Sequence, residues 1–188
     1  GKARKMGVKV ESEKKLDYQK GAPDEFKAMG GADEQANQAN AIKSRQSPGY
    51  LVAKDVFAEA ITQRADRIML DYTQQGVAVK YQIDGVWHDV EPRDRESGDL
   101  MLAVLKTLAN LNASERRARQ DGKFGAEFQG QHYVCQISSQ GVQTGERAVI
   151  SIDRGETTIE SLEEAGMRSK VFELWEAGLV EPTGLLVI

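Results

Sequence analysis

The segment Glu115 to Lys123 holds a group of charged side chains that could do chemistry. It carries four basic residues, Arg116, Arg117, Arg119 and Lys123, against the acidic Glu115 and Asp121. Guanidinium forks bind phosphate or carboxylate oxygens in pairs, so a phosphate or nucleic-acid site is one interpretation. The segment lacks the interleaved aromatic residues that stack bases. We favour the other interpretation, a charged loop that is solvated or pairs with a neighbouring domain, and expect interdomain contacts from Arg116, Arg117 and Arg119.

Two histidines and one cysteine, His88, His132 and Cys135, are the residues that could hold zinc. Their spacing matches no standard zinc site, so we expect no metal centre. Trp87 is either a core or an interface residue, and its position beside polar residues favours an interface.

The sequence lacks the motif that P-loop proteins need for phosphoryl transfer. ATP hydrolysis in P-loop proteins needs a glycine-rich loop with a lysine around the phosphates, and a hydroxyl and a carboxylate for magnesium. No G-x-x-x-x-G-K-[ST] pattern occurs in the sequence. We therefore expect no catalytic residue and no ATP hydrolysis by this chain alone.

Composition and net charge limit the classes of partner that this chain could bind. The 188 residues are 40% hydrophobic, which suffices for one compact domain with an appendage. The 25 basic and 29 acidic residues give a net charge of -4, so no broad attraction to nucleic acid is expected. The single cysteine cannot form an internal disulfide, and no run of 18 apolar residues occurs. These features favour a cytoplasmic location without direct membrane insertion.

The elements that position these residues begin after a polar stretch. Residues 1–47 are interrupted by glycines and poor in apolar side chains, which indicates a flexible or partly helical linker. The folded domain is expected from Pro48, with a helix to about Gln63 and a short strand around Ile68 and Leu70.

The clearest strand is Val77 to Ile83, where apolar and polar residues alternate strictly. Asp84-Gly85 predicts a two-residue hairpin turn, and residues 86–90 form the return strand. This register pairs Tyr81 with His88 on the apolar side and Gln82 with Trp87 on the polar side. We therefore expect His88 to be a structural residue that points toward the core.

The remaining pattern continues the alternation of helix and hairpin. A helix is expected over 99–111, a second hairpin over 123–138, and a further strand through Ala148, Ile150 and Ile152. Antiparallel strands with helices set to one face indicate an α+β domain, with a PAS-like sheet over residues 48–154. Residues 155–188 predict helices at 161–166 and 170–177 and a terminal strand at 184–188.

Three motifs, in order, carry a resemblance to a known family: Tyr81-Gln82-Ile83-Asp84-Gly85-Val86, the segment 115–123, and Gly145-Glu146-Arg147-Ala148-Val149. Together they resemble the pre-motor domain of type II secretion and type IV pilus assembly ATPases, over residues 48–188. In that family a stretch like Glu181 to Ile188 leads into the phosphate loop, which implies that this sequence stops before the motor. The resemblance implies a lid or adaptor domain in a hexameric ring, with ATP and Mg in the full-length parent.

The same resemblance implies which residues of the domain face the nucleotide bound by the motor. Two family arginines fall at Gln136 and Ser151, so both are replaced here. Lys80, Lys123 and Arg147 remain as candidate contacts with the nucleotide or the motor, and a family Asp-Ile-His stretch reads Arg67-Ile68-Met69. These departures imply that the domain touches nucleotide weakly or differently.

The resemblance also implies partners. They are the protein's own C-terminal motor, neighbouring subunits and inner-membrane platform proteins, which would place the protein at the cytoplasmic side of the inner membrane. A stand-alone PAS-like ligand-binding or protein-interaction module is the alternative. It would need an internal pocket, whereas the strands are rich in Val, Ile, Tyr and Phe.

Overall fold

The computed structural model describes residues 24–155 and 166–180. The chain divides into two units, of which the first ends at Arg154 and the second begins at Gly155. Within the first unit the elements are, in order, β1 (Glu25–Lys27), α1 (Glu34–Arg45), α2 (Gly49–Thr62), β2 (Arg67–Tyr72), β3 (Val77–Ile83), β4 (Val86–Asp89), α3 (Arg95–Leu108), β5 (Gln120–Phe128), β6 (Gln131–Val142) and β7 (Gly145–Asp153). The second unit contains α4 (Ser169–Val180).

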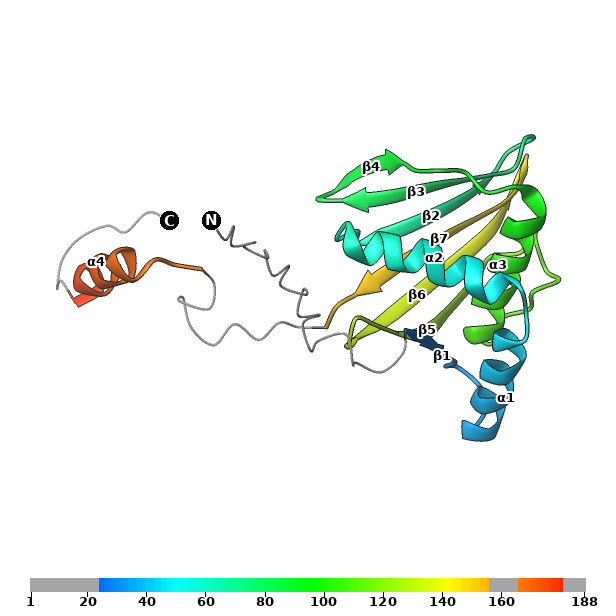
Figure 1. The fold of residues 1–188 in the computed structure, drawn as a ribbon, viewed down its shortest axis with the longest axis horizontal. Helices are drawn as coiled ribbons and strands as arrows, with labels where there is room; N and C mark the ends of the chain where they lie inside the picture. The colour runs from blue at the N-terminus through cyan, green and yellow to red at the C-terminus, as the bar shows by residue number, and fades with distance from the viewer. Residues whose placement is uncertain (1–23, 156–165, 181–188) are drawn as a thin grey trace, which may run out of the picture. The chain divides into compact units, whose positions relative to one another are not determined.

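The seven strands form one antiparallel sheet in the order β1-β5-β6-β7-β2-β3-β4. Helices α2 and α3 lie against one face of this sheet, and the other face is open (Figure 1). The fold is therefore α+β, as the sequence predicts. No helix in residues 24–155 and 166–180 combines the length and the apolar character that a membrane crossing needs.

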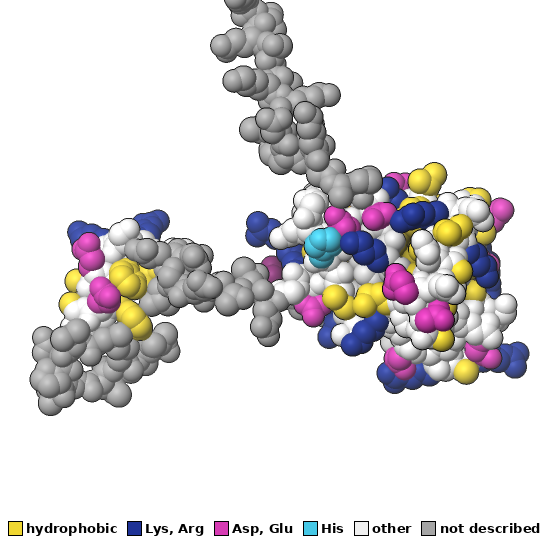
Figure 2. All heavy atoms as spheres, turned by 90° about the horizontal axis from the view of Figure 1, so that it is seen from below, with side chains coloured by type: hydrophobic (Ala, Val, Ile, Leu, Met, Phe, Trp, Pro, Cys, Tyr) yellow, Lys and Arg dark blue, Asp and Glu magenta, His cyan; other side chains and the backbone are white. Residues whose placement is uncertain are grey.

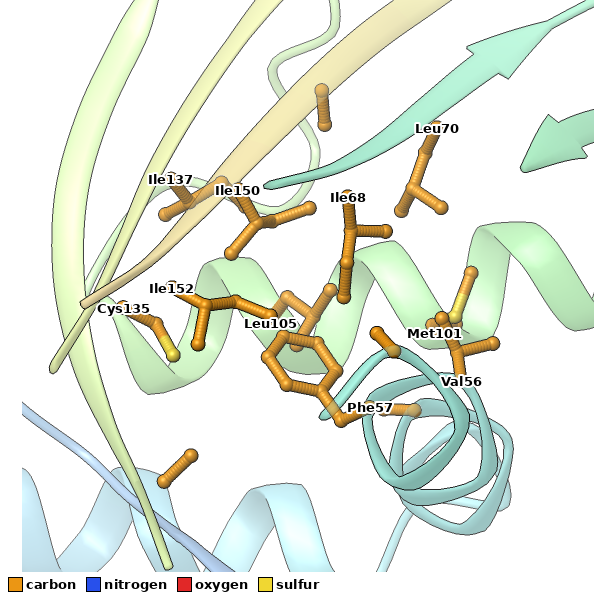
Figure 3. Close-up of a cluster of buried hydrophobic side chains, with 14 of the residues drawn as sticks. Val56, Phe57, Ile68, Leu70, Met101, Leu105, Cys135, Ile137, Ile150 and Ile152 are labelled. Atoms are coloured by element: carbon orange, nitrogen blue, oxygen red, sulfur yellow. The ribbon is translucent and has the colours of Figure 1, made fainter. Parts of the chain in front are cut away.

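The core fills the space between the sheet and the two helices. Figure 3 shows Val56 and Phe57 from α2 and Met101 and Leu105 from α3 pointing toward a layer of strand side chains. That layer comes from alternate positions of three central strands: Ile68, Leu70, Cys135, Ile137, Ile150 and Ile152. The period-two alternation in the sequence therefore separates a buried face from an open face along each of these strands.

Residues 24–47 do not form the linker that their composition predicts. Strand β1 pairs with β5, and Phe26 is fully buried against Tyr50, Phe57, Phe124 and Phe128, with ring centroids 5.0 to 5.9 Å from its own. The Met29 amide also donates to the Leu108 carbonyl at 2.9 Å. One aromatic anchor and a short strand pairing thus attach a segment that has few apolar residues, and the folded region begins well before Pro48.

The helix predicted over 99–111 has different bounds in the structure. Helix α3 begins at Arg95, four residues before the predicted start, because the Asp94 carboxylate accepts a hydrogen bond from the Ser97 amide and caps the helix there. It ends at Leu108 rather than at residue 111. The helix expected near 170–177 is present as α4. The helix predicted at 161–166 lies almost wholly outside the described residues, and the strand predicted at 184–188 lies outside them entirely.

Candidate functional site

The open face of the sheet brings together most of the residues that the sequence assigns to the nucleotide side. Cross-strand pairing places six residues in one row, which we call the open-face row: Lys123, Gln136, Ser151, Arg67, Gln82 and Trp87. They come from β5, β6, β7, β2, β3 and β4, and the residues on the five strands other than β4 each have a buried residue next to them in the chain. Since neighbouring strands lie about 4.8 Å apart, the four residues from Lys123 to Arg67 span about 14 Å.

Gln136 and Ser151, the two positions of the replaced family arginines, are direct partners in this row. Lys123 lies beside Gln136 and Arg67 lies beside Ser151. A surface hollow of about 520 Å³ covers the part of the row from Lys123 to Ser151. Its lining includes Arg119, Asp121, Lys123, Gln136, Ser138 and Ser151.

The cations on the open face differ in whether they already have a partner. Lys80 pairs with Asp89 at 3.0 Å, and Arg147 makes a forked contact with Asp71 at 2.7 and 3.1 Å. The hydrogen bond to Asp71 raises the pKa of Arg147. Lys123 and Arg67 have no ion pair or side-chain hydrogen bond with any residue in the described part of the chain. Two cations thus stand free on either side of Gln136 and Ser151, an arrangement suited to binding an anion.

The basic segment 115–123 is folded and held in place. The Glu115 carboxylate accepts hydrogen bonds from the Arg117 and Ala118 amides at 2.6 and 3.0 Å, which lowers the pKa of Glu115. Arg116 pairs with Asp99 at 3.0 Å, and Arg119 forks onto Asp121 at 2.9 and 3.2 Å. Two of the predicted interdomain cations are therefore paired within the domain itself.

The histidines and the cysteine lie in separate environments. Cys135 is fully buried on the helix side of β6, and this burial raises the pKa of its thiol to about 12. His132 lies on the open face beside Glu127 at 3.3 Å. Among residues 24–155 and 166–180, no three His, Cys, Asp or Glu side chains lie close enough together to hold a metal.

The prediction that His88 points toward the core is wrong. The hairpin register is as expected, with Tyr81 opposite His88 and Gln82 opposite Trp87. However, β4 is the edge strand and all four of its residues are exposed, because the helices cover Tyr81 but do not reach the edge. Trp87 is 37% exposed, in agreement with its expected position on the polar side.

Sequence reasoning did not select two cations that the structure places on this sheet, Arg67 in the open-face row and Arg95 at the end of the sheet. Arg67 reaches the open-face row because β2 pairs with β7, a contact between segments about 80 positions apart for which no local pattern gives a signal. Arg95 begins α3 and lies at the end of the sheet, beside the Gly145 turn. The Asp94 cap was the available signal for that helix start.

Comparison with known proteins agrees with the motifs. The family model described as "Type II/IV secretion system protein" matches residues 43–188. The chain is 26% identical to Type II secretion system protein E of Pseudomonas aeruginosa over 133 residues, covering 71% of this chain and 26% of that protein. It is 26% identical to the Type IV pilus assembly ATPase PilB of Thermus thermophilus over 143 residues, covering 76% and 16%.

A solved structure of the VirB11 ATPase from the Brucella suis type IV secretion system is also similar, at 12% identity and a TM-score of 0.43, covering 78% of this chain and 45% of that one. The chain spans about a quarter or less of the length of the two curated relatives described above. The family model, which covers more than three quarters of the sequence, decides the assignment. This chain belongs to the Type II/IV secretion system protein family.

Proposed function

We propose that this chain is the adaptor, or lid, part of a secretion or pilus assembly ATPase, and that the open face of its sheet turns toward the nucleotide of a motor domain. The observation that carries this proposal is the open-face row. It places Gln136 and Ser151 side by side, with the unpaired Lys123 and Arg67 on either side of them.

The chemistry of the row fits a polyphosphate. Lysine and arginine donate charge-assisted hydrogen bonds to phosphate oxygens, while glutamine and serine add neutral donors between them. No carboxylate occurs in the row, and Asp121, which lines the hollow beside it, is paired with Arg119. Since the family arginines are replaced, Lys123 and Arg67 supply the positive charge from the two neighbouring strands. In this proposal ATP and Mg belong to the longer protein, and this chain contributes contacts that change when nucleotide is bound.

The partners follow from the same proposal. Rotation of the adaptor part relative to the motor would be transmitted to neighbouring subunits of a hexameric ring and to an inner-membrane platform. The protein would then work at the cytoplasmic side of the inner membrane through these partners, without inserting into it.

The test is nucleotide affinity in the longer protein that contains the motor, followed by the anisotropy of a fluorescent ATP analogue. Lys123→Gln is expected to weaken binding by roughly tenfold, because one hydrogen bond to a charged group is lost. Gln136→Arg is expected to tighten binding by restoring a guanidinium fork. Lys43→Gln is the matched control, since it removes the same charge from the exposed surface of α1. Equal affinity of Lys123→Gln and the unmodified protein would contradict the proposal.

A further inference from the structure

A second surface hollow lies at the end of the sheet where β2 ends, β5 begins and β6 turns into β7. The β2–β3 and β6–β7 turns lie together there, at the upper right of Figure 1. The hollow has a volume of about 720 Å³ and is lined by Arg95, Arg116, Arg117 and the turn from Gly141 to Gly145. We call it the arginine hollow.

The three guanidinium groups are incompletely matched by carboxylates. Arg116 pairs with Asp99 at 3.0 Å. Arg95 lies 5.4 Å from the centre of the Tyr72 ring and donates to the Thr73 carbonyl at 3.2 Å, so its charge has no acidic partner among the described residues. The Arg117 side chain makes no ion pair or hydrogen bond within the described part of the chain. The hollow therefore has an excess of positive charge.

The loop that carries Arg116 and Arg117 is held in place by hydrogen bonds from the Lys106 and Gln120 side chains. Lys106 forms an ion pair with Glu146 in the interior and donates to the Glu115 carbonyl at 2.6 Å. The Gln120 side chain donates to the Asn112 and Glu115 carbonyls, at 3.1 Å each. These bonds fix the loop in one conformation, which lowers the entropic cost of binding a ligand.

The floor of the hollow requires a glycine. The Gly141 amide donates to the Arg117 carbonyl at 3.1 Å, and a Cβ at Gly141 would lie 2.9 Å from the Arg117 Cα. Only a residue without a side chain allows β6 to approach the basic loop this closely. The positions of the arginines thus depend on packing of the loop against β6 as well as on their own hydrogen bonds.

We propose that the arginine hollow binds the carboxylates of an acidic segment of a partner protein. Guanidinium forks donate paired hydrogen bonds to carboxylate oxygens, and three of them around an open hollow suit several acidic side chains in sequence. A nucleotide base finds no stacking surface, because the Tyr72 ring is buried and lies under Arg95. The net charge of -4 and the interspersed acidic and basic side chains on the face seen in Figure 2 also disfavour a nucleic acid. This proposal does not rest on the open-face row, which shares no residue with the hollow.

The experiment is a titration of the isotope-labelled 188-residue chain with hexaglutamate, followed by NMR. The expected result is saturable shifts of the Gly141, Gln143 and Thr144 amides and of the Arg117 side-chain Nε–H, with an affinity that falls as ionic strength rises. Arg117→Gln should weaken binding by about tenfold, because a charge-assisted contact is lost. This variant should fold normally, since the Arg117 side chain has no partner in the described part of the chain.

Arg64→Gln is the matched control, because Arg64 is exposed and precedes β2, at the end of the sheet away from the hollow. It should leave the affinity for hexaglutamate unchanged. The proposal is overturned if hexaglutamate gives no saturable shifts, or if Arg64→Gln weakens binding as much as Arg117→Gln, since the attraction would then be general. Shifts at these residues with inorganic phosphate or ATP, but not with hexaglutamate, would overturn it in favour of a phosphate site.

Discussion

Lys106 lies in the interior of the β-sheet domain, with its ammonium group beside the Glu146 carboxylate. The two side chains are 1% and 2% exposed. The pair connects α3 to β7, and the bond from Lys106 to the Glu115 carbonyl extends this connection to the basic loop. Removing one member of such a pair leaves the other charge buried without compensation, which costs more than the intact pair contributes.

Lys106→Met is expected to lower the free energy of unfolding by about 3–5 kcal/mol, since Glu146 is left as an unpaired buried charge. Urea denaturation measures this change. The double variant Lys106→Met with Glu146→Leu should recover most of the loss. Arg119→Gln, which breaks an exposed pair with Asp121, should leave stability almost unchanged, because solvent screens that pair. A loss for Lys106→Met no larger than that of Arg119→Gln would show that the pair is not buried as described.

The buried thiol of Cys135 makes the stability of the fold fall at high pH. Burial raises the pKa of its thiol from the ordinary value of 9.0 to about 12, so the unfolded chain loses the proton first as pH rises. The stabilising contribution is therefore complete below pH 9 and is lost between pH 9 and about 12. Urea denaturation of the native chain should show a steeper loss of stability over this range than Cys135→Ala shows. Parallel curves for the two proteins would contradict this prediction.

At the scale of elements, β1 joins residues 24–47 to the sheet. Its pairing with β5 covers a sheet edge, and Phe26 completes an aromatic cluster with side chains from α2 and β5. Helix α1 is then joined to the end of α3 by the Asn40 side chain, which donates to Asn110 at 3.1 Å. Residues 24–47 are therefore part of the domain.

Phe26→Ala should lower the free energy of unfolding by about 3–5 kcal/mol, because a fully buried aromatic ring is replaced by a cavity. Met29→Ala, in the same segment but 37% exposed, should change it by about 0.5 kcal/mol or less. Chemical denaturation of both variants gives the comparison. If Phe26→Ala were as mild as Met29→Ala, residues 24–47 would be an appendage as their composition suggests.

The contact between α2 and α3 depends on Gly49. A Cβ at this position would lie 2.3 Å from the Leu100 carbonyl carbon and oxygen, so the helices could not approach as they do. Gly49→Ala is expected to destabilise the domain by about 1–3 kcal/mol through overpacking. Gly178→Ala in α4, where the added Cβ would meet nothing in the described part of the chain outside its own helix, should leave the unfolding of the β-sheet domain unchanged. Thermal unfolding of the two variants tests whether the helices approach this closely.

Local signals predict elements well but not which elements become neighbours. Asp84-Gly85 and the alternation before it predict the β3–β4 register because a two-residue turn determines both. The pairing of β2 with β7, and of β1 with β5, joins segments far apart in the chain, so no local pattern contains it. For that reason the local sequence does not indicate Arg67 as a site residue, and it predicts that His88 points toward the core although its strand lies at the sheet edge.

At the scale of the whole molecule, the first unit presents two surfaces of different character. The open-face row places Lys123 and Arg67 on the side of the sheet that the helices leave uncovered. The arginine hollow lies at one end of the same sheet. As proposed above, the row would contact a nucleotide and the hollow a partner protein, and both could be occupied at once because they share no residue.

The most direct test of this account is the ATPase rate of the longer native protein, measured beside that of the 188-residue chain. If the chain is the adaptor part of a secretion or pilus assembly ATPase, the longer protein hydrolyses ATP and this chain alone does not. A longer protein that does not hydrolyse ATP, or a native polypeptide without a motor domain, would contradict the account and favour a stand-alone interaction module.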